Sequence, residues 1–160
     1  KSMSKVYALS GARAAYLCGS SHQLEPLRSL TPPWAVSLPA QIAAVHALAD
    51  PLYYEARYVE THDLRAQLVR GLEAMAGVEV VPSTTNFVLF HLPEDGPDAA
   101  TVVDLCRQHD VFLRDASSMG TEVGKHGIRL AVKDAETNRT VLEVLQKSTT
   151  RAGLKKNGRI

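Results

Sequence analysis

The chain has 160 residues, which is enough for one domain or for a small domain with part of another. Its hydrophobic content of 45%, charged content of 22% and net charge of +1 are ordinary for a globular protein and give no electrostatic case for a nucleic-acid or membrane partner. No apolar run approaches the roughly 18 residues of a membrane-spanning helix. Residues 1–10 lack the apolar core of a signal peptide, so we expect a cytoplasmic protein.

The first half of the chain is predicted to be mostly helical. Two short apolar runs, 6–9 and 14–17, are expected to form strands joined by a turn at Gly11. Apolar residues at helical spacing then predict helices at 21–30, 37–50 and 52–76. Ser37 is the expected N-cap of the second helix, and Gly77 ends the third. The buried face of the third helix is expected to carry Leu64, Leu68, Leu72 and Met75.

The second half alternates short strands with helices. Runs rich in β-branched and aromatic residues predict strands at 78–81, 86–92, 111–113 and 128–132. Helices are predicted at 99–109 and 135–146, and the basic segment 147–160 is expected to be a disordered tail. A mixed sheet with helices on it indicates an α/β or α+β unit.

The cysteines and histidines indicate neither a disulfide framework nor a metal site. Cys18 and Cys106 lie far apart, and two cysteines in a chain of this size predict two reduced, packed thiols. The six histidines are scattered and form no ligand spacing with each other or with a cysteine, so no metal is expected.

The N-terminal segment carries the residues with the clearest chemical logic. Lys5 is flanked by Ser2 and Ser4 and is followed, eight residues later, by Arg13. Hydroxyl donors and a guanidinium suit a phosphate group, and a lysine amine can condense with an aldehyde. A single lysine is far more often a solvated surface charge, and a short Ser-x-Ser-Lys run does not decide between the two interpretations.

The run from Ser2 to Tyr16 resembles the lysine segment of the fold-type I aminotransferases, class I/II. That family has Ser-x-Ser-Lys, a short apolar stretch, Gly-x-Arg, then a small residue and an aromatic. The resemblance implies that Lys5 forms a Schiff base with pyridoxal 5'-phosphate and that Arg13 contacts its phosphate. It implies that Ser2 and Ser4 help to hold that phosphate. Ala12 departs from the family, which usually has a larger apolar residue there.

The resemblance continues downstream in 85–89, 111–115 and 127–132. It implies that Arg129 binds the substrate α-carboxylate through its planar fork of donors. The local sequence around Arg114 is most similar to the histidinol-phosphate aminotransferase branch, where an arginine in this strand can contact the substrate's distal phosphate. Two plainer interpretations stay open: Arg129 pairs with a helix carboxylate, and Arg114 with Asp115 is only structural.

The resemblance also implies a domain organisation and an activity. The expected parts are the end of a large cofactor-binding domain (1–36), linking helices (37–76), a small α+β domain (77–146) and a tail (147–160). The implied reaction is transamination between an amino acid, or an amino-alcohol phosphate, and a 2-oxo acid. We expect a cytoplasmic homodimer that serves amino-acid biosynthesis.

Other outcomes remain open at this point. The family's upstream half supplies an aspartate for the pyridine nitrogen, a ring-stacking aromatic and a phosphate loop, so we expect residues before Lys1 and expect these 160 residues alone to be inactive. A decarboxylase of a phosphorylated amino acid would share Lys5 and Arg13 and differ only in the Cα bond that breaks. A non-catalytic α/β interaction module would bind no cofactor at all.

Overall fold

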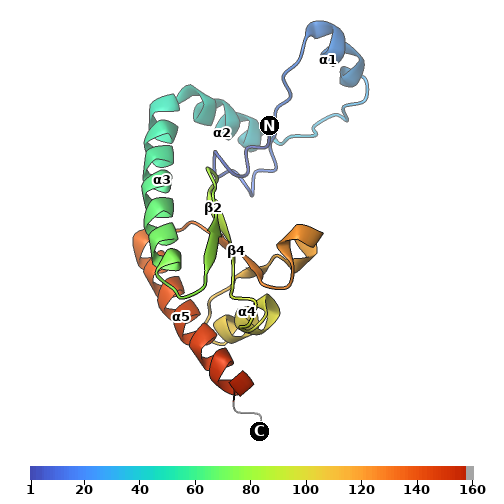
Figure 1. The fold of residues 1–160 in the computed structure, drawn as a ribbon. Coiled ribbons are helices and arrows are strands. Elements are labelled where there is room, and N and C mark those ends of the chain that lie inside the picture. Colours follow the sequence, from blue (N-terminus) through green and yellow to red (C-terminus); the bar gives the residue numbers. More distant parts are fainter. Residues whose placement is uncertain (158–160) are drawn as a thin grey trace. The chain divides into compact units, whose positions relative to one another are not determined.

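The computed structural model describes residues 1–157, apart from the side chains of 122, 151 and 153–157 (Figure 1). Contacts divide the chain into two compact units, Lys1–Tyr58 (unit 1) and Val59–Ile160 (unit 2). The division falls within the segment 37–76 that was expected to link two domains, inside helix α3 (Pro51–Glu73). Each unit has its own cluster of buried apolar residues.

Unit 1 is built from the N-terminal loop, two helices and the first turns of α3. Helix α1 (Ser21–Arg28) contains Pro26 and buries no residue, whereas α2 (Leu38–Ala49) buries Ala40 and Ala47. Ser37 precedes α2 with extended backbone, as predicted, and Pro39 lies in the first turn. The small core of unit 1 is made by Met3, Ala14, Ala40 and Ala47.

The strands expected at 6–9 and 14–17 are wrong: turns lie at residues 6–7 and 10–13, and the pairing of this segment is an isolated bridge between Ser2 and Ala15. The physical reason lies in the backbone. Ala8 and Arg13 both have φ 54, and a left-handed residue cannot continue an extended ladder. Of the residues in these two runs only Ala14 is buried, and Ala8, Ala15 and Leu17 are exposed, so the apolar runs mark neither a strand nor a continuous core.

Unit 2 is an antiparallel sheet covered on one face by helices. Within the described residues the strands follow the order β1 (Glu79–Val81), β2 (Phe87–His91), β4 (Gly127–Ala131) and β3 (Arg114–Asp115). The helices are α4 (Ala99–Arg107), α5 (Ala135–Asn157) and the later turns of α3, with short 3-10 turns at Ser117–Met119 and Thr121–Val123. Figure 1 shows α4 and α5 next to each other.

Alternation along the strands separates the core from the open face of this sheet. Val88, Phe90, Ile128 and Leu130 are buried against helix residues that include Leu68, Leu72, Val102 and Leu145. The predicted buried face of α3 is therefore confirmed at Leu68 and Leu72, with Met75 partly buried. Helix α3 ends at Glu73, and Gly77, at φ 72, turns the chain toward β1.

The strand expected at 111–113 is displaced. Val111 and Leu113 are buried and Phe112 is exposed, so the alternation is real, but pairing with β4 begins only at Arg114. Asp110 has φ 59, which breaks the extended backbone just before this run. The alternation of apolar residues with a period of two predicts which side chains are buried, but it does not predict which backbone groups form hydrogen bonds to a neighbouring strand.

The end of the chain differs from the expectation of a tail disordered from residue 147. Helix α5 continues to Asn157, and its buried stripe runs on through Ser148 and Ala152. Small residues do not mark an apolar face in the sequence, so the helix was predicted too short. Residues 158–160 lie outside the described part of the chain.

The two thiols have different environments. Cys106 is fully buried, burial raises the pKa of its thiol, and the Ser148 hydroxyl offsets part of that rise. Cys18 is exposed, which contradicts the expectation of two packed thiols. The loop after Tyr16 buries little, since Leu17 is also 66% exposed.

Replacing Phe90 by alanine should lower the free energy of unfolding by about 3–5 kcal/mol, because its fully buried ring fills the core of unit 2. Phe112 gives the matched control, since 74% of that side chain is exposed. Phe112→Ala should change stability by less than about 0.5 kcal/mol. Denaturant titration of the full chain measures both, and equal midpoints for the two variants would contradict this core.

Candidate active site

The lysine loop, residues 1–16, is closed by pairing between its two ends. The Met3 amide donates to the Ala14 carbonyl at 3.1 Å, and the Tyr16 amide donates to the Lys1 carbonyl at 3.0 Å. Arg13 directly precedes Ala14, and Lys5 follows Met3 by two residues. The backbone therefore brings the positions of Lys5 and Arg13 to the same end of this pairing.

The serine hydroxyls gather beside Lys5. The Ser2 hydroxyl donates to Ser4 Oγ at 3.1 Å and accepts from the Ser4 amide at 3.2 Å. The Ser10 hydroxyl donates to the Ser4 carbonyl at 2.7 Å, which ties the far side of the loop to the same segment. Ser2, Lys5 and Arg13 are exposed and Ser4 is half-buried, so these polar groups are accessible to a ligand.

The backbone of the lysine loop is strained at Arg13. A left-handed conformation costs a residue with a Cβ roughly 1–2 kcal/mol, and Arg13 holds φ 54. The bend was expected at Gly11, which has no left-handed φ and has open space where a Cβ would stand. Strain that the surrounding hydrogen bonds maintain is often found at functional positions, and here it falls on the predicted phosphate ligand.

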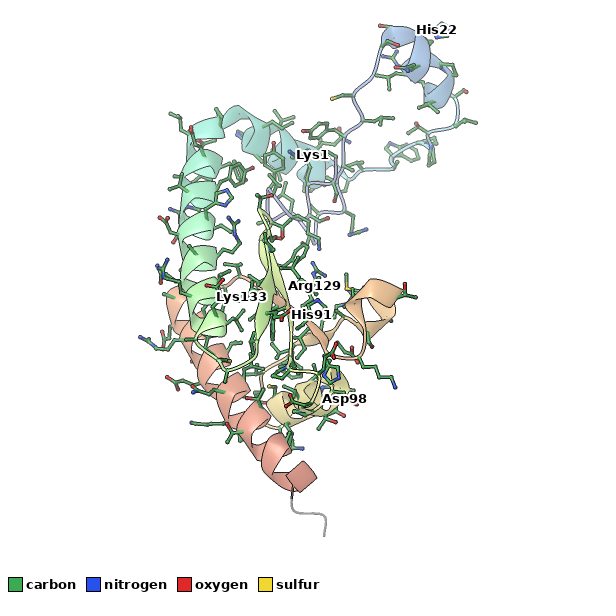
Figure 2. All side chains as sticks on the ribbon, viewed as in Figure 1. Lys1, His22, His91, Asp98, Arg129 and Lys133 are labelled. Atoms are coloured by element: carbon green, nitrogen blue, oxygen red, sulfur yellow. The ribbon has the colours of Figure 1, made fainter. Side chains whose placement is uncertain are left out.

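Aromatic side chains pack within the lysine loop and against it. Tyr7 contacts Tyr54 of α3 edge-on, with ring centroids 4.8 Å apart and an angle of 73° between the planes. The Lys1 ammonium lies 5.9 Å from the centre of the Tyr7 ring (Figure 2). Partial burial raises the pKa of Tyr16, and neighbouring Tyr7 raises it further. Tyr7 and Tyr16 are partly buried and pack against the small core of unit 1.

In unit 2 the strand register places two arginines side by side. Arg114 of β3 is directly opposite Arg129 of β4 in an antiparallel pair, so their side chains leave the same face of the sheet. Arg114 is exposed and Arg129 is half-buried. Like charges in facing positions are unfavourable, which makes this pair a place where an anionic ligand would be stabilising.

Neither arginine is neutralised by a carboxylate among the described residues. Asp115 instead accepts a hydrogen bond from the Ser117 amide at 2.8 Å, so the simple Arg114–Asp115 pair is not formed. The Arg129 Nε is buried and has no hydrogen-bond partner in the described structure, and the guanidinium lies over the Phe87 ring. Figure 2 marks Arg129 on the sheet.

The six predicted site residues thus fall into two groups. Ser2, Ser4, Lys5 and Arg13 belong to unit 1, and Arg114 and Arg129 belong to unit 2. Phe87 was not predicted as a site residue. Its place beside Arg129 depends on the register between β2 and β4, which the sequence alone does not reveal.

The described part of the chain contains neither a metal-binding cluster nor a membrane-spanning helix. No group of three or more histidine, cysteine, aspartate or glutamate side chains there is arranged to hold a metal ion. None of the helices among these residues combines the length and apolar character needed to span a bilayer.

The chain belongs to a known family of enzymes. The model of the family described as aminotransferase class I and II matches residues 1–145, which confirms the family predicted from the lysine segment. The lysine loop, the small antiparallel sheet and its helices are thereby parts of a class I/II aminotransferase fold.

The relatives refine this membership. A histidinol-phosphate aminotransferase of Rhodopseudomonas palustris (strain BisB5) is 31% identical over 144 residues, which are 89% of this chain and 38% of that protein. The solved histidinol-phosphate aminotransferase of Sinorhizobium meliloti, in complex with pyridoxal-5'-phosphate, has a TM-score of 0.82 at 25% identity and covers 93% of this chain and 40% of its own. This chain spans about two fifths of the length of its relatives.

A second reaction type is found on the same fold. The L-threonine-O-3-phosphate decarboxylase of Porphyromonas gingivalis matches with a TM-score of 0.78 at 24% identity, over 91% of this chain and 44% of that one. At this identity the likeness shows the fold alone. The predicted fold class is confirmed by these structures, whereas the roles of individual residues stay predictions.

Replacing Arg114 by glutamine should stabilise the chain at low ionic strength, because it removes a positive charge that faces Arg129. We expect a gain of about 0.2–1 kcal/mol that shrinks as salt screens the charges. Arg107→Gln is the matched control, since it breaks an exposed ion pair with Asp104 at 2.8 Å and should give no gain. Denaturant unfolding at low and high salt measures the effect, and a salt-independent difference would argue against facing charges.

Proposed function

We propose that the enzyme containing this chain is a pyridoxal-phosphate-dependent aminotransferase in which Lys5 binds the cofactor covalently. The observation that carries the proposal is the closed lysine loop, which holds Lys5 and Arg13 at the same end of a backbone pairing. A protein-bound pyridoxal phosphate supplies an electron sink for the substrate carbanion. The family match and the relatives' names support this activity over a non-catalytic module.

The residues of the lysine loop fit the phosphate arm of such a cofactor. A phosphate dianion calls for several hydrogen-bond donors and a fixed cation. Ser2 and Ser4 provide hydroxyl groups beside Lys5, and Arg13 provides a guanidinium that no carboxylate of the described residues neutralises. The strained backbone of Arg13 is then part of how the loop aims this side chain.

Lys5 would have a second task with the cofactor bound. Its Nζ, as a neutral amine, would take the proton from the substrate Cα and return it to the cofactor carbon on the other side of the substrate nitrogen. The exposed position of Lys5 in the lysine loop leaves the amine free to move between these two atoms. The reverse sequence with a 2-oxo acid completes the amino transfer.

Arg129 and Arg114 orient the substrate in this proposal. Arg129 binds a carboxylate, and Arg114 takes a second anionic group such as a phosphate. A substrate with two anionic ends, or an amino-alcohol phosphate such as histidinol phosphate, suits two neighbouring guanidiniums. The two arginines lower the reaction barrier by orienting the reacting bond, and they take no part in bond making or proton transfer.

The remaining parts of the site are expected outside these 160 residues. The group that holds the pyridine nitrogen and the aromatic that stacks on the ring belong, by the family resemblance, to the first half of the fold. We therefore propose that this chain alone does not turn over substrate, and that the intact enzyme is a cytoplasmic homodimer. The likeness to a decarboxylase gives the alternative, in which carbon dioxide rather than an amino group leaves Cα.

Reduction with borohydride tests the cofactor site directly. In the enzyme incubated with pyridoxal phosphate, peptide mapping after reduction should find the cofactor on Lys5. Amino transfer to 2-oxoglutarate should fall by at least about 100-fold in Lys5→Arg, because the proton carrier is lost. Lys133→Arg, at an exposed lysine of unit 2, is the matched control and should keep both label and activity.

Each result separates the alternatives. Label on another lysine, or full activity in Lys5→Arg, would contradict the assignment of Lys5. Carbon dioxide release without amino transfer would favour the decarboxylase. A protein that takes up no cofactor would favour the interaction module.

A further inference from the structure

The open face of the sheet brings Phe87 and Arg129 together. Val88 and Leu130 are buried on the helix-covered face, so Phe87 and Arg129, their neighbours in sequence, leave from the opposite face. Phe87 pairs with Ala131 and Leu89 pairs with Arg129, which makes Phe87 the diagonal neighbour of Arg129. Long side chains span the 7–8 Å or so of such a diagonal.

The contact between the two side chains is close. The Arg129 Cζ lies 3.9 Å from the centre of the Phe87 ring, well inside the distance of about 6 Å at which a cation is attracted to a ring face. With Arg114 opposite and no carboxylate among its described neighbours, Arg129 depends on this ring for a favourable electrostatic contact.

Phe87 is itself held in place by its backbone. Its carbonyl accepts hydrogen bonds from Ser83 Oγ at 3.3 Å and from Thr85 Oγ1 at 3.0 Å. The Thr85 carbonyl in turn accepts from Arg65 of α3 at 3.0 Å. The start of β2, which carries the ring, is thereby attached to a helix of the same unit.

The buried atom of Arg129 decides which donors an anion can reach. Its Nε has no hydrogen-bond partner and no access to solvent in the described structure. A carboxylate or phosphate can bind a guanidinium side-on, through Nε and one terminal nitrogen, or end-on, through both terminal nitrogens. Burial of Nε leaves the end-on geometry.

We propose that Phe87 is the positioning residue of Arg129, and that its ring holds the guanidinium so that the two Nη nitrogens receive the anionic group of the substrate end-on. The inference rests on the proposed role of Arg129 in substrate binding and adds the residue that sets its geometry. Phe87 touches neither substrate nor cofactor and acts through Arg129.

Inorganic phosphate is the probe for this geometry. Phosphate is titrated into the full chain while the β4 amide resonances and the Arg129 guanidinium resonances are followed by NMR. The Nη resonances of the wild-type chain should move more than the Nε resonance. Affinity at these signals should fall roughly tenfold in Phe87→Leu, which keeps an apolar side chain but removes the ring.

Two further variants separate positioning from stability. Phe87→Tyr keeps a ring face and should bind phosphate within about twofold of the wild type. Phe112→Leu removes an exposed ring elsewhere in unit 2 and should leave the affinity unchanged. In the intact enzyme, Phe87→Leu should lower kcat/KM for the anionic substrate roughly tenfold, since Arg129 both binds and orients that substrate.

Several results would overturn the inference. They are wild-type affinity in Phe87→Leu, a Phe87→Tyr variant as weak as Phe87→Leu, a larger shift at Nε than at Nη, or no phosphate binding at these signals in the wild type. Failure of the proposed function is a separate outcome, because an enzyme that attaches no cofactor at Lys5 leaves the phosphate titration free to decide the role of Phe87.

Discussion

Cationic side chains without protein counter-charges are the constraint on which this account depends. Arg13 in unit 1, and Arg114 and Arg129 in unit 2, have no carboxylate partner among the described residues. Both placements carry a cost, a left-handed backbone at Arg13 and facing like charges at Arg114 and Arg129. Hydrogen bonds of the lysine loop hold the Arg13 backbone, and strand pairing holds the two facing arginines, despite these unfavourable energies. An anionic cofactor or substrate would offset them.

The parts of the fold that follow from local pattern were predictable from the sequence. Helix α2 begins after Ser37, and α3 and α4 bury the apolar residues that their spacing indicates, among them Leu72 and Cys106. The predictions were wrong where the pattern of apolar residues does not determine the backbone conformation. Left-handed residues interrupt the apolar runs near Ala8 and Asp110, and small residues hide the buried stripe of α5 beyond residue 146.

The site shows the same division between local and long-range information. The spacing of Lys5 and Arg13 is local, and it sufficed to predict the family that the comparison confirmed. The contacts of Arg129 with Arg114 and with Phe87 depend on pairing between strands. Arg114 is 15 residues before Arg129 and pairs with it directly. Phe87 is 42 residues before Arg129, and it comes next to Arg129 because Leu89, two residues after Phe87, pairs with Arg129. A one-residue slip would turn these side chains to the other face, so the arginine geometry required the structure.

The most direct test of the central claim is the phosphorus NMR signal of pyridoxal phosphate bound to the intact enzyme. If Arg13 grips the phosphate, its second pKa, about 6 when free, is lowered, and the signal keeps its dianion position as the pH falls through that range. Arg13→Gln should then restore a titration near the free value. A wild-type signal that titrates as the free cofactor does would contradict the account.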